Sequence, residues 1–139
     1  MPAAVSALNG SPSEMRHRDS YDANSIWDFI TYHDNDRDII TCASPCTGNG
    51  DLGYTPVANC HAYTVISTHT FTRANGDLAR ILKVRNPWGA ELYKGPWSDN
   101  WNGWTQHDRE QLPNVKKNDG LFYIDVDSYV DNFSHTAVN

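Results

Sequence analysis

Residues 61–89 have the sequence HAYTVISTHTFTRANGDLARILKVRNPWG, in which two alternating segments flank an Asn-Gly-Asp turn. Alternation with a period of two, carried here by β-branched and aromatic residues, is typical of a half-buried strand. Asn75 and Gly76 tolerate the positive φ angles that tight turns require. We therefore predict a β-hairpin. One face of its first strand is expected to carry His61, Tyr63, Val65, Ser67 and His69.

The hairpin predicts a specific polar pair at its open end. Antiparallel pairing returns the last residues of the second strand to the first residues of the first, so His61 and Asn86 are expected to be cross-strand neighbours. A histidine that acts as a general base uses one ring nitrogen for the reactant and needs an acceptor for the other. The Asn86 carboxamide can be that acceptor, and Trp88 is large enough to cover the hydrogen bond. The structural alternative is that both polar residues are ordinary features of a strand start and a turn.

The segments on either side of the hairpin predict short helices and further strands. Residues 25–34 have helical spacing of apolar residues, with Asp22 or Asn24 as the cap, and residues 38–44 are typical of a buried strand. The sequence does not show the alternation of strands and helices that is typical of a parallel sheet. We therefore predict an α+β domain: a mainly antiparallel sheet or half-open barrel of about six strands, with two or three short flanking helices.

The C-terminal part completes this prediction. Residues 119–126 predict a strand, Asp127 is the expected cap of a helix over residues 128–133, and residues 135–139 are expected to form an exposed tail or edge. Residues 1–23 lack sustained periodicity and predict a flexible N-terminal leader. Residues 24–139 are long enough for one domain and too short for two.

Composition excludes several classes of partner. A net charge of −6, with no basic cluster beyond Lys116 and Lys117, argues against binding to nucleic acid or to an anionic membrane. No stretch approaches the roughly 20 apolar residues of a membrane span. Three cysteines, an odd number, predict no disulfide framework, so a reducing compartment and a cytoplasmic location are expected.

The cysteines also argue against a zinc site. Cys42, Cys46, Cys60 and His61 do not follow a usual zinc spacing. Neighbouring residues of a strand point to opposite faces, so Cys60 and His61 are not expected to share an ion.

Five segments resemble, in the same order, motifs of the calpain-type cysteine protease core of the papain-like superfamily. CHAYTV and ILKVRNPWG resemble the family's GHAYSV and its strand that ends in R-N-P-W-G. Further on, GPWSDN, WNGWTQHDREQL and NDGLFYIDVDSYVDNF resemble its G-x-W-S-D segment, its W-x-x-x-x-x-x-x-R-x-x-L segment and its D-G-E-F block. Upstream, IWDFITYHDNDRDIITCAS is similar to the helix and strand that open this half of the core. The resemblance covers the chain from Ile26 to the C-terminus.

The resemblance implies the C-terminal lobe of the calpain core, the second half-domain, which carries the catalytic His and Asn. His61 resembles the catalytic base, Asn86 its orienting residue, and Trp88 the tryptophan that packs beside them. In the family the nucleophilic Cys lies in a preceding half-domain, and the residues before Ile26 do not resemble it. We therefore expect an endopeptidase half that cleaves polypeptides only with a Cys-bearing lobe supplied, and that is inactive alone.

Two other functions stay open. The first is a non-catalytic calpain-like module that binds proteins, since Cys60 stands where the family has Gly and crowds the approach of substrate. The second is an aromatic-rich β-domain that binds carbohydrate or peptide. Solvent-facing tryptophans would favour that function, whereas Trp97, Trp101 and Trp104 are expected to pack loops onto the sheet.

Calcium is the one cofactor that the resemblance implies. Asp99 and Asp119 match acidic ligands of the family's site, but Leu92 and Leu121 stand where it has acids, with Glu91 one residue out of place. Calcium takes about six to eight oxygen ligands, so the loss of two carboxylates predicts weakened binding.

Overall fold

The structure is a computed structural model and describes residues 14–46, 57, 60–87, 89, 93–113 and 119–139. Its elements in chain order are β1 (Glu14–His17), the 3-10 turn η1 (Arg18–Ser20), α2 (Ala23–Asn35), β2 (Ile40–Ala43), β3 (Ala62–Thr72), β4 (Leu78–Arg85), α3 (Gln106–Gln111), β5 (Leu121–Asp125), α4 (Val126–Asn132) and β6 (His135–Val138).

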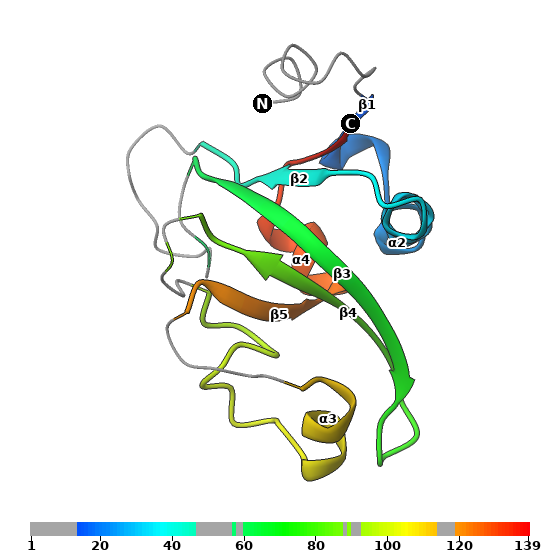
Figure 1. The fold of residues 1–139 in the computed structure, drawn as a ribbon, viewed down its shortest axis with the longest axis vertical. Coiled ribbons are helices and arrows are strands. Elements are labelled where there is room, and N and C mark those ends of the chain that lie inside the picture. The colour runs from blue at the N-terminus through cyan, green and yellow to red at the C-terminus, as the bar shows by residue number, and fades with distance from the viewer. Residues whose placement is uncertain (1–13, 47–56, 58–59, 88, 90–92, 114–118) are drawn as a thin grey trace.

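The strands form one antiparallel sheet in the order β1-β6-β2-β3-β4-β5. The sheet is open, because β1 and β5 stand at its two ends. Figure 1 shows β3 and β4 as its long central strands, with α3 beside the end where they meet in their turn. The predicted α+β architecture is confirmed.

The predicted hairpin is confirmed as β3 and β4. Its turn is closed by a hydrogen bond of 2.8 Å from the Arg73 amide to the Asp77 carbonyl, and Gly76 has a φ of 91°. That left-handed backbone suits glycine, which has no Cβ. The turn therefore fixes the register that brings the two strand ends together at the opposite end of the hairpin.

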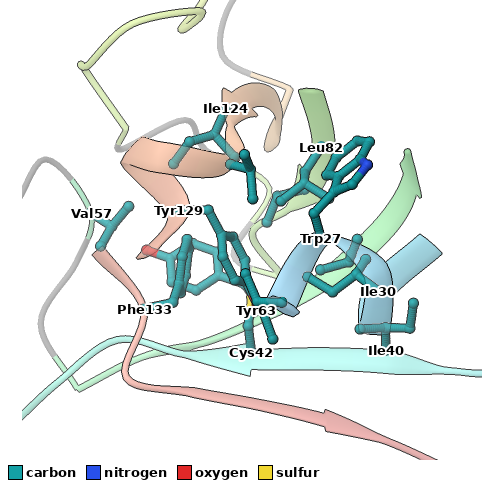
Figure 2. Packing of buried hydrophobic residues seen from close by; sticks show 14 of the residues in the cluster. Trp27, Ile30, Ile40, Cys42, Val57, Tyr63, Leu82, Ile124, Tyr129 and Phe133 are labelled. Carbon is teal, nitrogen blue, oxygen red and sulfur yellow. The ribbon is translucent and has the colours of Figure 1, made fainter. Parts of the chain in front are cut away.

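The main core lies between the sheet and helices α2 and α4 (Figure 2). Asp22 caps α2 in a capping box with Ser25, which fixes where the helix begins. From that start, Ile26 and Ile30 point at the sheet, and both are fully buried. Tyr63 of β3 meets Phe133 edge to face at 5.2 Å. Burial of each such side chain contributes about 1.5–3 kcal/mol, so this cluster holds the start of β3 in place.

A second cluster covers the other face of the sheet. Ile81 of β4 belongs to it, whereas its neighbour Leu82 belongs to the main core, because successive strand residues point to opposite faces. Trp97 is buried there, with Trp101 and Trp104 packed against it. The tryptophans therefore pack as expected, and none that the structure describes is among the exposed large hydrophobic residues.

The prediction that one face of the first strand carries all five alternating residues is wrong beyond Val65. The register shifts between Val65 and Ser67, which leaves Ile66 as an extra residue in β3. A bulge of this kind moves every later side chain to the other face. Ser67 and His69 consequently lie opposite Lys83 and Ile81, on the side of the second cluster.

The C-terminal predictions need two corrections. Residues 135–138 form β6, an interior strand between β1 and β2, and not an exposed tail or edge. Asp125, rather than Asp127, caps α4 by accepting from the Ser128 amide, because β5 passes directly into the helix.

Part of the predicted leader belongs to the sheet. Residues 14–17 form β1, a short and mostly exposed strand that pairs with β6. The division into a leader of residues 1–23 and a domain of residues 24–139 stays a prediction, since residues 1–13 lie outside the described part.

The sequence predicted no disulfide framework, but the structure has one disulfide. Cys46 and Cys60 form a disulfide, and Cys42 is a buried free cysteine. The physical reason is the pairing of β2 with β3, whose backbone hydrogen bonds continue past Ala43 and Ala62. The Cys60 amide donates to the Pro45 carbonyl, which brings Cys60 beside the residue that precedes Cys46.

Candidate active site

His61 and Asn86 are joined by a side-chain hydrogen bond at the open end of the hairpin. Nε2 of His61 lies 2.8 Å from Oδ1 of Asn86. The paired register ends at Thr64 and Arg85, so the contact runs diagonally across the strand ends. Asn86 is fully buried, and burial strengthens such a bond because water does not compete for it. The predicted neighbours are thus in contact.

The backbone of Asn86 is held on both sides. Its amide donates to the Gly120 carbonyl at 2.8 Å, and its carbonyl accepts from the Gly89 amide at 3.0 Å. Gly120 has a φ of +82°, and a Cβ there would lie 2.8 Å from Cα of Gly89 and 3.0 Å from the Asn86 carbonyl oxygen. Glycine is therefore required for the close approach that fixes Asn86.

The backbone and ring of His61 are also fixed. Its amide donates to Oγ of Ser44 at 2.9 Å, and its carbonyl accepts from the Ser44 amide at 3.0 Å. The imidazole meets the Tyr63 ring edge to face, with centroids 4.8 Å apart. His61 therefore has its main chain and its ring oriented by separate groups.

A pocket of about 330 Å³ opens beside His61. Cys46 and Cys60 line it together with Ser134 and His135. Burial, and then the nearby His17, lower the pKa of His135, so this second histidine favours its neutral form. The pocket therefore places a disulfide and a second imidazole next to His61.

Cys42 lies on β2 and is fully buried. Burial raises the pKa of its thiol well above the ordinary value, although a hydrogen bond with Tyr129 opposes that effect. A thiolate is the reactive form of cysteine, so Cys42 does not have the chemistry of a nucleophile.

The other predicted site residues are not brought into this group by the described structure. Trp88 lies outside the described residues, as do Glu91 and Leu92. Asp99 is buried, and Asp119 accepts from the Leu121 amide at 3.0 Å. Among the residues that the structure describes, no three His, Cys, Asp or Glu side chains form a group that could hold a metal ion. The calcium site stays a prediction.

Sequence reasoning missed three residues of the site: Ser44, Gly120 and His135. Ser44 and His135 have no local signal, because both depend on which strands become neighbours of β2. Gly120 does have a local signal, because the dipeptide Asp119-Gly120 is typical of a turn with positive φ.

No helix in the described part of the chain combines the length and apolar character needed to cross a membrane.

Comparison with known proteins gives one family. The family model described as calpain family cysteine protease matches residues 1–139. The rat calpain-1 catalytic subunit is 39% identical over 81 residues, which cover 56% of this chain and 11% of that protein. The mouse calpain-2 catalytic subunit is 26% identical over 105 residues, 72% of this chain and 15% of that protein. Mouse calpain-12 is 35% identical over 85 residues, with coverage of 56% and 11%. The chain thus spans only a small part of these relatives.

Proposed function

The chain belongs to the calpain family of cysteine proteases, and we propose that it supplies the His/Asn half of a two-lobed protease site. In this proposal His61 is the general base, Asn86 orients it, and Trp88 packs beside them. The substrate is a polypeptide, and a Cys-bearing lobe supplies the nucleophile.

The hydrogen bond between His61 and Asn86 is the observation that carries the proposal. A carboxamide oxygen only accepts hydrogen bonds, so the hydrogen of this bond belongs to Nε2. Nδ1 is then the nitrogen that exchanges a proton with the thiol. Cysteine proteases of the papain-like kind use this combination of Cys, His and Asn.

The proposed reaction is an acyl transfer. The thiol gives its proton to Nδ1 of His61, and the thiolate attacks the carbonyl carbon of the scissile peptide bond. The imidazolium returns the proton to the leaving amine, which leaves an acyl-thioester. Water then attacks the thioester, with His61 again accepting a proton, and the acid product and free thiol are released.

The chain's own cysteines explain why a partner lobe is proposed. Cys42 is buried with its thiol protonated, and Cys46 and Cys60 are joined as a disulfide. A thiolate next to His61 must therefore come from another segment. The cytoplasmic location stays a prediction, and the disulfide weighs against it because such bonds are rare in the cytosol.

Complementation tests this proposal. The purified chain is mixed with a Cys-bearing lobe from another calpain, and hydrolysis of a fluorogenic peptide is followed. His61→Ala should abolish activity, because general base catalysis contributes about 10²- to 10⁴-fold. Asn86→Ala should reduce it by less, since the base remains but is no longer oriented. Asn35→Ala, at an exposed asparagine at the end of α2, is the matched control. Equal activity in the unaltered and His61→Ala chains would refute the proposal.

A protein-binding module without catalysis is the second candidate. The observation that favours it is the Cys46–Cys60 disulfide, which occupies part of the wall of the His61 pocket. The same experiment separates the two functions. Association with the Cys-bearing lobe or with a peptide, without hydrolysis in any combination, would favour the binding module.

A further inference from the structure

Ser44 binds both backbone polar groups of His61. The Ser44 amide donates to the His61 carbonyl at 3.0 Å, and the His61 amide donates to Oγ of Ser44 at 2.9 Å. Oγ also lies 3.2 Å from the His61 carbonyl, to which the hydroxyl donates. Ser44 is buried, with 4% of its surface exposed. One side chain therefore fixes the peptide groups on both sides of the His61 side chain.

This contact replaces the usual end of an antiparallel ladder. The register of β2 and β3 ends at Ala43 and Ala62, and a further hydrogen-bonded pair would exchange two bonds between backbones. Here the serine hydroxyl takes the place of one backbone carbonyl, because a hydroxyl both donates and accepts. Alanine at position 44 would retain the hydrogen bond from its backbone amide to the His61 carbonyl and would lose both contacts of the hydroxyl.

The residue before His61 has an unusual backbone. Cys60 has a φ of 51°, in the left-handed region that residues with a Cβ rarely adopt. Two contacts hold it there. Its amide donates to the Pro45 carbonyl at 3.0 Å, and its side chain is bonded to Cys46. The direction in which β3 starts, and with it the His61 Cα–Cβ bond, depends on this conformation.

We propose that Ser44 and the Cys46–Cys60 disulfide are positioning residues for His61, and call this set the His61 clamp. The inference rests on the proposed function of His61 and adds a dependence that the function does not require. Reduction of the disulfide releases Cys60 from the left-handed conformation and loosens the imidazole from Asn86. A glycine at position 60 adopts the same backbone without a cross-link.

The clamp is local, which makes it separable from the stability of the fold. Its contacts lie at the ends of β2 and β3, whereas the main core consists of apolar side chains between the sheet and helices α2 and α4. Backbone amide resonances of Leu82 and Ile124, both fully buried in strands, report on the core. The ring Nε2–H resonance of His61 reports on the clamp.

The first experiment follows that ring resonance in the isotope-labelled chain. The hydrogen bond to Asn86 protects the Nε2–H of His61 from exchange with water. Asn86→Ala removes the acceptor and therefore defines complete loss of this resonance. Ser44→Ala should lose it and Ser44→Thr should retain it. With Cys46→Ser as a common background, Cys60→Ala should lose the signal and Cys60→Gly should retain it. Reduction of the unaltered chain with a phosphine should have the effect of Cys60→Ala.

Each outcome decides one part of the proposal. A retained signal in Ser44→Ala overturns the role of Ser44, and one in the Cys60→Ala double variant overturns the role of the disulfide. Loss in the Cys60→Gly double variant overturns the argument from the left-handed backbone. Collapse of the Leu82 and Ile124 amide resonances in a variant would show a structural role and also count against positioning.

The second experiment uses the complemented enzyme. Variants that lose the ring signal should lower kcat, because the base is misoriented in the transition state, and any change in KM should be much smaller. Full activity of His61→Ala would refute the proposed function. If His61→Ala is inactive but Ser44→Ala and the Cys60→Ala double variant keep the kcat of the unaltered chain, only the clamp is refuted.

Discussion

The Asn86 side-chain oxygen lies 2.8 Å from Nε2 of His61, although 25 residues separate the two in the chain. The hairpin turn and the pairing of β3 with β4 close that separation. Gly120 then fixes the asparagine from the side of β5, and Ser44 fixes the histidine from the side of β2. The pair is therefore positioned by the strands on both sides of the hairpin.

Gly120→Ala should disturb this pair more than an ordinary glycine substitution. Gly120 and Gly76 both have positive φ, but a Cβ at Gly76 has nothing within 4 Å, whereas one at Gly120 meets backbone atoms. Gly76→Ala should cost about 1–2 kcal/mol of unfolding free energy for its backbone alone. Gly120→Ala should cost more, because the Asn86 and Gly89 backbones must shift. Urea denaturation of both variants measures the difference, and equal losses would contradict the close approach.

The parts of the fold that could be predicted have local causes. The hairpin follows from alternation around Asn75 and Gly76, and α2 follows from the Asp22 cap and the spacing of Ile26 and Ile30. The proximity of His61 and Asn86 also follows from the hairpin, because antiparallel pairing fixes which strand ends meet.

The parts that could not be predicted depend on long-range pairing. The bulge at Ile66 reverses the faces of Ser67 and His69, and no property of that residue alone marks an extra strand position. Residues 136–138 are buried in β6, which lies between β1 and β2. The disulfide likewise depends on the neighbouring ends of β2 and β3, which an odd cysteine count cannot reveal.

Arg73→Met should destabilise the fold, because it leaves a buried carboxylate without its cation. Arg73 donates to both oxygens of Asp108, at 3.2 and 2.8 Å, and Asp108 is fully buried. Removal of one partner of such a pair costs about 3–5 kcal/mol. Arg85→Met, at an exposed arginine, is the control and should change stability by less than about 0.5 kcal/mol. A similar loss in both variants, measured by chemical denaturation, would contradict this explanation.

The Arg73–Asp108 pair also predicts how the free energy of unfolding changes at acidic pH. Burial alone would raise the pKa of Asp108, but hydrogen bonds from Arg73 and Thr105 outweigh it, so the pKa is below its ordinary value of 3.8. The stabilisation is present above that value and is lost as the pH falls through the lower, folded-state pKa. In Arg73→Met the folded-state pKa of Asp108 rises toward or above its unfolded value, so this acid-dependent loss should shrink or reverse. An unchanged acid midpoint would contradict the assignment.

His69 should make stability depend on pH near neutrality. Burial, and then the positive charge of Lys83, lower its pKa from 6.5, with Asp34 opposing. A lowered histidine pKa means that the unfolded chain binds the proton first, so this contribution is complete above pH 6.5 and is lost as the pH falls through the folded-state pKa. His69→Gln should flatten the dependence and Lys83→Met should reduce it. Denaturation between pH 5 and 8, about the range in which histidine titrates, tests both.

Calcium should bind more weakly than it does to a site with a full set of acidic ligands. Asp99 and Asp119 are the matching acids, but Leu121 offers no side-chain oxygen, and calcium requires about six to eight oxygens. Titration calorimetry of the chain should detect no micromolar binding. Micromolar binding that Asp119→Asn abolishes would contradict the prediction and identify Asp119 as a ligand.

The purified chain alone should hydrolyse no peptide bond. A nucleophilic cysteine must be an accessible thiolate beside its base. Cys42 is buried, and burial raises its pKa, so it stays protonated, while Cys46 and Cys60 are held in their disulfide. Loss of even one oxyanion-hole donor costs about 10²- to 10³-fold in rate, and the proposed site takes such donors from the other lobe.

A fluorogenic peptide should therefore stay intact with and without a phosphine reductant. Cleavage that survives His61→Ala would indicate a contaminating protease. Cleavage that His61→Ala abolishes, and that appears only with the reductant, would show that Cys46 or Cys60 becomes the nucleophile once the disulfide opens.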